Sequence, residues 1–294
     1  MITAIIPSYN RPEIIVSLVL NILSQSYFQK EEGEIIISVD ESDTQIGQYR
    51  NLINQIKLIA KNINPRISID LLVNETKGIV PAKNNAVKKA KYNLIMMFDD
   101  DLIPEHDYIE KLATDLIKDS SVGAVSGYIV SYEPAISHTQ PSDRLTSIPT
   151  ENTLQILNII HEKEGWRSAF GKKEQVMDWS TINDRIDINK RFEVDYFVNS
   201  YMFTRESYEK TRGYNISLNS KTAAHEEVDF TYRIGKSGYK LILNPFARMW
   251  HLTVKRGGIY KGETFEESKS ILEKEYNDSI VTFIESIKKG LKSE

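Results

Sequence analysis

Short runs of β-branched and aliphatic residues alternate with helix-like patterns over about the first 130 residues. The runs predict strands at residues 3–7, 34–39, 67–73, 94–98 and 123–130. Helices are predicted between them at residues 10–26, 44–61, 81–91 and 105–118, and Asn10 is the expected N-cap of the first helix. This alternation favours an α/β fold with a doubly wound, Rossmann-like, mainly parallel sheet and helices on both faces.

Composition narrows the class of protein. The 294 residues are 40% hydrophobic, which is enough to bury the core of one large domain or of a domain with an appended subdomain. The 37 basic and 41 acidic side chains give a net charge of −4 and no long basic tract occurs, so nucleic acid is not an expected partner. Because the chain has no cysteine, a metal would need oxygen or imidazole ligands, which suit a hard divalent cation.

The N-terminus lacks the basic and apolar pattern of a leader peptide, and no run of about 18 apolar residues occurs in the chain. We therefore expect a soluble, cytoplasmic protein.

Polar side chains follow three of the predicted strands at the point where each strand ends. Residues 8–11 follow the first strand, residues 40–43 the second and residues 99–101 the fourth. Because ligands of such sheets bind beyond the carboxyl ends of the strands, we expect one binding site there. The first loop is not GxGxxG and no GxxxxGK[ST] occurs, so a nicotinamide enzyme and a P-loop NTPase are disfavoured.

The triplet Asp99, Asp100 and Asp101 places three like charges directly behind an apolar run. Repulsion and desolvation oppose this arrangement, so a cation is expected to compensate. In an extended segment Asp99 and Asp101 would point the same way and Asp100 aside, which would form a D-x-D clamp for Mg²⁺ or Mn²⁺. The alternative is a solvated acidic turn in which one aspartate caps the next helix.

Two further groups could carry chemistry. Glu226 and Glu227 stand at the start of a helical pattern, where one of two adjacent carboxylates could act as a general base. Acidic residues at a helix N-terminus are also common because they interact favourably with the helix dipole. His251 follows a strand-like run and could add an imidazole ligand to an oxygen-rich metal site, although a single histidine is more often structural.

The pattern weakens after residue 131. Three prolines interrupt residues 131–195, a helix is predicted at 154–164, and we interpret this segment as an acceptor-side insertion that covers the sheet edge. Trp166 and Trp179 either line an acceptor cleft or are ordinary core residues.

The rest of the chain regains a clear pattern. Residues 193–215 predict a strand, a helix and a turn, and residues 225–251 predict a helix, a turn and a final strand. From Phe265 the tail predicts an amphipathic helix that packs on the domain, pairs with a second subunit or contacts a membrane surface.

Five segments in order carry a resemblance to a known family. They are IIPSYNRPE, IIISVDESDT, KGIVPAKNNAVKKA, MMFDDDLIP and the run from YMFTRESYEK to MWH. The ordered set resembles the family 2 inverting glycosyltransferases, whose nucleotide-sugar-binding fold is called GT-A. The resemblance spans about residues 2–251 and leaves out the tail and much of the insertion.

The resemblance implies a GT-A-like domain at residues 1–260, followed by an amphipathic helical tail at residues 261–294. Within the domain, residues 1–130 would bind the nucleotide sugar, and residues 131–260 would bind the acceptor and carry the catalytic base.

Individual roles also follow from the resemblance. The residues expected to bind the nucleotide sugar are Pro7, Ser8, Tyr9, Arg11, Asp40, Lys83, Asp99 and Asp100. Tyr9 matches a residue placed to stack on the base, and Asp40 matches the acidic residue that recognises the base. Asp101 matches the principal metal ligand, and Asp99 and His251 match additional ones.

The sequence departs from the family pattern at three places. Lys83 stands where the family usually has arginine, which would make its nucleotide contact single-pronged. Glu227 stands where the family usually carries the aspartate that serves as base, directly after Glu226, so either glutamate could be the base. VDES replaces the more usual VDDGS, so either Asp40 or Glu41 could meet the nucleotide base.

The implied activity is inverting transfer of a sugar from a UDP- or GDP-linked donor to a hydroxyl of a glycan, lipid-linked or other acceptor, assisted by Mn²⁺ or Mg²⁺. One alternative is a catalytically inactive protein of the same fold that binds nucleotide sugars. A sugar-phosphate nucleotidyltransferase is less favoured, because its glycine-rich N-terminal signature is absent from PSYNRPE. The tail leaves peripheral membrane contact or a homodimer open.

Overall fold

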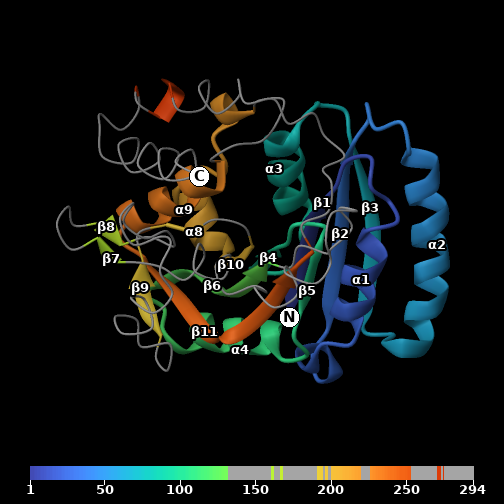
Figure 1. Ribbon diagram of the computed structural model, residues 1–294, viewed down its shortest axis with the longest axis horizontal. Helices are drawn as coiled ribbons and strands as arrows, with labels where there is room; N and C mark the ends of the chain where they lie inside the picture. The colour runs from blue at the N-terminus through green and yellow to red at the C-terminus, as the bar shows by residue number, and fades with distance from the viewer. Residues whose placement is uncertain are drawn as a thin grey trace, which may run out of the picture.

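The structure of the chain is a computed structural model that describes residues 1–131, 160–161, 166–167, 191–194, 196–197, 200–219, 226–252, 270–272 and 274. Figure 1 shows how its helices and strands are arranged.

All five strands predicted in the first half are confirmed within a few residues. They are β1 (Ile2–Pro7), β2 (Gly33–Asp40), β3 (Ile67–Asn74), β4 (Leu94–Met97) and β6 (Val122–Ser131). The four predicted helices are α1 (Ile15–Leu23), α2 (Ile46–Ile63), α3 (Ile79–Lys89) and α4 (Tyr108–Lys118). The 3-10 helix η1 (Ser26–Gln29) and the short strand β5 (Leu102–Pro104) are additional.

The second half contains the predicted strand–helix and helix–strand pairs. They are β10 (Tyr201–Thr204) with α8 (Arg205–Lys210), and α9 (Glu226–Lys236) with β11 (Lys240–His251). The remaining elements are β9 (Phe192–Val194) and the 3-10 helix η2 (Ile216–Leu218).

Nine strands of the described residues form one sheet in the order β3-β2-β1-β4-β10-β6-β11-β5, with β9 paired to β11. Strands β3, β2, β1, β4, β6 and β11 run in one direction, whereas β10, β5 and β9 run against their neighbours. The predicted mainly parallel sheet is confirmed, with the antiparallel β10 in its middle. The loops after β1, β2 and β4 therefore leave the sheet at the same edge.

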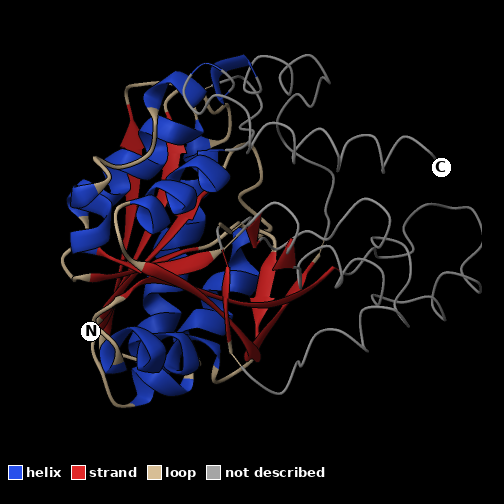
Figure 2. Ribbon diagram, turned by 90° about the vertical axis from the view of Figure 1, so that its left-hand side faces the viewer, coloured by secondary structure: helices blue, strands red, loops and turns tan. Residues whose placement is uncertain are grey.

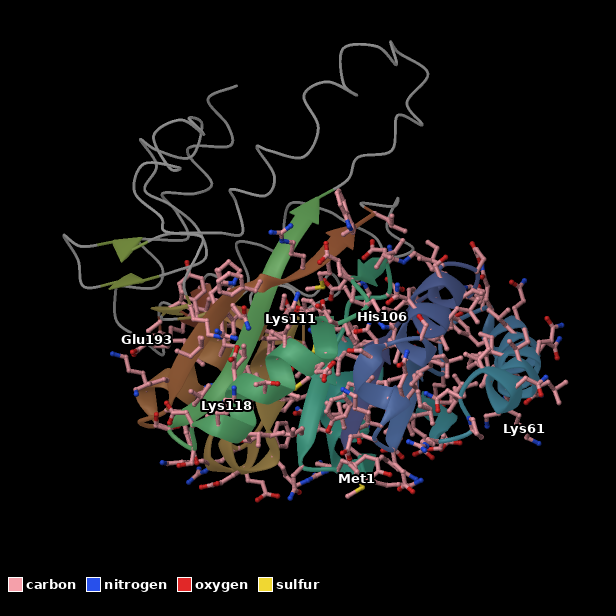
Figure 3. The ribbon with its side chains drawn as sticks, turned by 90° about the horizontal axis from the view of Figure 1, so that it is seen from below. Met1, Lys61, His106, Lys111, Lys118 and Glu193 are labelled. Carbon is pink, nitrogen blue, oxygen red and sulfur yellow. The ribbon has the colours of Figure 1, made fainter. Side chains whose placement is uncertain are left out.

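Helices cover both faces of the sheet, as Figure 2 shows. α1, α2 and α4 pack on one face through buried residues such as Leu18, and Figure 3 shows α4 on this side with its Lys111 and Lys118. α3, α8 and α9 pack on the other face through residues such as Val87 and Phe230. Because β1 and β2 are covered on both faces, they are buried along their whole length, which fixes the loops that follow them.

The loop after β1 corrects one prediction. Asn10 is not the N-cap of α1, which begins at Ile15; Asn10 has a φ of 53°, in the left-handed region that asparagine tolerates better than most residues. Its side-chain oxygen accepts hydrogen bonds from the N–H and hydroxyl of Thr44 at 3.2 and 3.1 Å, and its N–H donates to Asp43 at 2.6 Å. The capping pattern was wrong because this side chain bonds to the loop after β2.

A helix was predicted at residues 154–164, but Ile160–His161 form the strand β7. This strand pairs antiparallel with β8 (Trp166–Arg167), so the pairing of its backbone is with another strand and not within a helix. Trp179, His225 and most of the predicted insertion lie outside the described residues, as does most of the tail. Residues 270–272 and 274 of the tail are helical, as predicted.

The predicted division into a domain at 1–260 and a tail at 261–294 stays a prediction. Among the residues that the structure describes, no helix is both long and apolar enough to cross a membrane.

Gly78, which precedes α3, provides a test of this packing. It has a φ of 111°, and a Cβ added there would collide with the side-chain amide of Asn219. Gly78→Ala should therefore lower the free energy of unfolding by about 2 kcal/mol, measured by urea denaturation. Gly47→Ala is the control, because an added Cβ meets nothing within 4 Å there, and it should leave stability unchanged or slightly higher. Equal stability of the two variants would contradict this account.

Candidate active site

The buried carboxylate of Asp100 is the centre of a polar cluster at the carboxyl edge of the sheet. Its side chain is only 2% exposed, accepts a hydrogen bond from Ser8 Oγ at 2.6 Å and forms an ion pair with Arg11. Ser8 Oγ also bonds to the hydroxyl of Tyr49 at 2.7 Å. Burial raises the pKa of Asp100 to about 7, although Arg11 and Ser8 act in the opposite direction.

Arg11 is shared between two aspartates. Its Nη1 lies 3.4 Å from Oδ2 of Asp101, and its Nη2 contacts Asp100. Asp101 is buried, with 6% of its surface exposed. The side chain of Arg11 therefore supplies part of the positive charge that was expected beside the triplet.

The strand-like alternation expected for the triplet is wrong. Strand β4 ends at Met97, and the chain turns at Asp100 and Asp101, so the period of two no longer applies. Asp100 does not point aside but shares Arg11 with Asp101. Asp99 is partly buried, and its N–H donates to Ser200 Oγ at 2.9 Å.

Strand β11 ends beside this turn. The N–H of Leu252 donates to the carbonyl of Asp101 at 2.9 Å, and His251 is paired with Leu102 of β5. The backbone thus brings position 251 next to Asp101; the side chain of His251 lies outside the description. Among the described residues, no group of three or more histidine or acidic side chains is arranged to hold a metal, so Asp99 and Asp101 would need further ligands from elsewhere.

Asp40 lies at the end of β2 and is 6% exposed. One of its carboxylate oxygens accepts hydrogen bonds from the N–H and hydroxyl of Ser42, and the other accepts one from the N–H of Gly78 at 2.9 Å. These bonds fasten the loop after β2 to the start of α3. The neighbouring Glu41 is exposed, Tyr9 is partly buried, and Pro7 is buried as the last residue of β1.

Lys83 does not lie open at the edge of the sheet. Its side chain is 2% exposed, and its Nζ lies 2.8 Å from Oε1 of Glu226 and 2.6 Å from Oε1 of Glu227. Burial alone would lower the pKa of Lys83, but the two glutamates raise it well above its usual range, so the ammonium stays protonated. Burial raises the pKa of Glu227, and Lys83 partly opposes that rise.

Two residues that sequence reasoning missed hold this second cluster in place. Nζ of Lys83 lies 5.5 Å from the ring centre of Tyr214, a cation–π contact. Asn84 accepts hydrogen bonds from the N–H of Tyr214 and the hydroxyl of Tyr208, and donates to the carbonyl of Tyr214 at 2.9 Å. Both residues lie in segments that the sequence analysis singled out, AKNN and RGYN, but the spacing of the segments does not show that they are in contact.

The two clusters belong to one electrostatic environment. The charge of Asp99 raises the pKa of both Lys83 and Glu227, although it is not the largest influence on either group. The contact of Lys83 with both glutamates joins α3 to the start of α9, and the charge of Asp99 from the loop after β4 acts on this cluster.

Residues 3–197, more than half of the chain, match the sequence profile described as Glycosyl transferase family 2. The chain belongs to this family. It is 25% identical over 261 residues to the poly-beta-1,6-N-acetyl-D-glucosamine synthase of Staphylococcus aureus (strain COL), a match covering 88% of this chain and 52% of that protein. The chain thus spans about half the length of the curated relatives it matches.

Solved structures give the fold. GalNAc-T7 in complex with UDP, GalNAc and Mn²⁺ matches with a TM-score of 0.63 and 16% identity, over 93% of this chain and 47% of that chain. The mannosyltransferase PcManGT from Pyrobaculum calidifontis, bound to GDP-Man and Mn²⁺, matches with a TM-score of 0.57 and 18% identity, over 95% and 64%. S. aureus TarS 1–349 with UDP matches with a TM-score of 0.52 and 14% identity, over 92% and 64%. The expected GT-A fold is confirmed.

Arg11 gives the testable consequence of the first cluster. Arg11→Met should lower the free energy of unfolding by about 3 kcal/mol in urea denaturation, because it leaves the buried Asp100 without its cation. The loss should be smaller in the background of Asp100→Asn, which removes the charge that Arg11 balances.

Arg66→Met is the control, since Arg66 is exposed and its guanidinium donates to the carbonyl of Gln29 and not to a buried carboxylate; a change within about 0.5 kcal/mol is expected. Strictly additive losses for Arg11→Met and Asp100→Asn would show that the two side chains are not coupled.

Proposed function

We propose that this chain is an inverting glycosyltransferase that moves a sugar from a nucleotide-diphosphate sugar, UDP- or GDP-linked, to an acceptor hydroxyl with the help of Mn²⁺ or Mg²⁺. The observation that carries the proposal is the pair of acidic clusters, one with Asp100 and Asp101 on Arg11 and the other with Glu226 and Glu227 on Lys83. Family membership supports the reaction class. Solved neighbours bound to UDP or GDP-Man, two of them with Mn²⁺, support the donor class and the metal.

Charge balance supports a divalent cation at the triplet. The guanidinium of Arg11 contacts two of the three aspartates, Asp100 and Asp101, so the triplet keeps up to two negative charges in excess when all three are ionised. A divalent cation would match that excess, and Asp101 with Asp99, and with His251 from the adjoining end of β11, are the residues that would hold it. When bound, the cation stabilises negative charge on the departing diphosphate.

The donor would lie on the loops after β1 and β2. Tyr9 would stack on the base, Asp40 would recognise it, and Arg11 and Ser8 would face the phosphates and ribose together with Asp99. Asp100 would act from beneath, because it is buried and holds Ser8 and Arg11. Pro7 ends β1 and sets the direction of this loop.

The chemical step assigned to the protein is a proton transfer. Glu227 accepts the proton of the acceptor hydroxyl, whose oxygen forms a bond to the anomeric carbon from the side opposite the diphosphate. The bond between that carbon and the diphosphate oxygen breaks, and its electron pair leaves with the nucleotide. Glu226, which shares Lys83 with Glu227, is the second candidate for the base.

Replacement of the base tests the function directly. A panel of UDP-, GDP- and dTDP-sugars with Mn²⁺ or Mg²⁺ should reveal one donor that the wild type transfers or slowly hydrolyses. Glu227→Gln should bind that donor with an affinity within a few-fold of wild type by calorimetry, and should lose at least about 100-fold in turnover, because the amide cannot accept the proton. Glu209→Gln, on the exposed side of α8, is the control and should keep full activity.

Full turnover by Glu227→Gln would remove this residue from the base position and leave Glu226 as the candidate. Donor binding by the wild type without transfer or hydrolysis would instead favour the alternative, a catalytically inactive nucleotide-sugar-binding protein. Formation of a nucleotide sugar from a sugar phosphate would favour the nucleotidyltransferase.

The pH dependence follows from the same glutamate. The base acts only when ionised, and burial raises the pKa of Glu227 above the ordinary value of 4.5, so activity should rise with pH and be lost on the acid side. A plot of kcat/KM against pH should place the midpoint of this acid limb above pH 4.5. A profile that stays flat down to that pH would contradict the assignment.

We propose roles for two segments that lie mostly outside the described residues. We propose that the insertion within residues 131–190 contacts a glycan, lipid-linked or other hydroxyl acceptor, and that the helical tail packs on the domain, on a second copy or on a membrane surface of a cytoplasmic protein.

A further inference from the structure

We infer that Lys83 is a positioning residue for the catalytic base: it holds the carboxylate of Glu227 at the sheet edge from the opposite half of the domain. This inference rests on the proposed function. It also replaces the role that the sequence suggested for Lys83, which was a contact to the nucleotide.

The first support is the geometry of the ammonium group. Nζ lies 2.6 Å from Oε1 of Glu227 and 2.8 Å from Oε1 of Glu226, so two of its three donors are directed at the two carboxylates. The side chain of Lys83 is 2% exposed, which leaves the ammonium almost no contact with water. A lysine held in this way fixes the direction of the carboxylates instead of reaching out to a nucleotide.

The second support is the rigidity of the lysine itself. The ammonium lies over the ring of Tyr214, and that ring is fixed because its hydroxyl bonds to Tyr201 at 2.8 Å and its backbone bonds twice to Asn84. Asn84 follows Lys83 on α3, so the same helix positions both the lysine and the aromatic ring beneath its charge. Neither end of the contact can shift without breaking these bonds.

The third support is where the glutamates stand. They are the first two residues of α9, and the hydroxyl of Thr231 bonds back to the carbonyl of Glu227 at 2.8 Å. Thr231 is fully buried and also accepts a hydrogen bond from the N–H of Phe197 at 2.8 Å. The backbone of Glu227 is thus anchored to the core, and Lys83 anchors its carboxylate, which leaves the side chain little freedom to turn away from the acceptor.

A comparison of two lysines on α3 tests the inference. Lys83→Met keeps the length of the stem but removes the ammonium, and should lower kcat by about 100-fold while the Kd for UDP or GDP with Mn²⁺, whichever the wild type binds, changes less than about threefold. Lys83→Arg keeps the charge and should recover part of kcat. Lys89→Met, exposed on the same helix, should match the wild type in every measurement.

Combining variants separates positioning from a general loss of structure. Lys83→Met should cause little further loss of turnover in Glu227→Gln, since the base that it positions is already gone. An additive loss would overturn the inference, as would an unchanged kcat in Lys83→Met. A Kd raised more than about tenfold with kcat little changed would restore the nucleotide-binding role instead.

Two outcomes keep the test decisive. Should Lys83→Met fail to fold, Lys83→Arg alone decides, because the longer side chain and planar guanidinium of arginine would hold the two carboxylates in different positions: kcat should fall about tenfold with Kd unchanged, and wild-type kcat would overturn the inference. A wild type that binds donor without transferring or hydrolysing it overturns the proposed function and this inference together, whereas wild-type transfer that is insensitive to Lys83 overturns the inference alone.

Discussion

The burial of Lys83 between Glu226 and Glu227 is the contact on which the two halves of the site depend. A charged group taken out of water costs several kcal/mol unless it is paired, so the burial of Lys83 and Glu226 depends on their contact, and the partly buried Glu227 adds a second carboxylate. Lys83 comes from α3 in the first half of the chain, and the glutamates come from α9 in the second. Both helices must pack on the same face of the sheet for the pair to form, and they do.

The need to pair buried charges also applies to the cluster around Arg11, and the two clusters together give this end of the sheet an excess of negative charge. Arg11 serves Asp100 and Asp101, and Lys83 serves Glu226 and Glu227, so each cluster holds more carboxylates than cations. The fold can bury this excess only in part. A nearby cation would be attracted strongly, because charges in such a poorly hydrated site are weakly screened.

Periodicity predicted the elements well and the contacts poorly. The strands and helices of the first half follow from alternating apolar patterns, which are local and therefore readable in the sequence. The expected alternation failed because the chain turns at Asp100, whose carboxylate pairs with Arg11, 89 positions earlier. The contact of Lys83 with Glu227 joins residues 144 positions apart, and no spacing rule reaches across that distance. The edge could thus be predicted as a site, but the partners within it could not.

The two departures from the family pattern at this edge turn out to touch each other. In the match that the resemblance implies, Lys83 takes the place of a longer arginine and Glu227 that of a shorter aspartate. The two differences in length act in opposite directions, and Nζ and Oε1 meet at 2.6 Å. Under that match, the extra methylene of Glu227 extends its carboxylate toward the shorter cation. The two differences that the resemblance implies are therefore structural counterparts, because the two side chains contact each other directly.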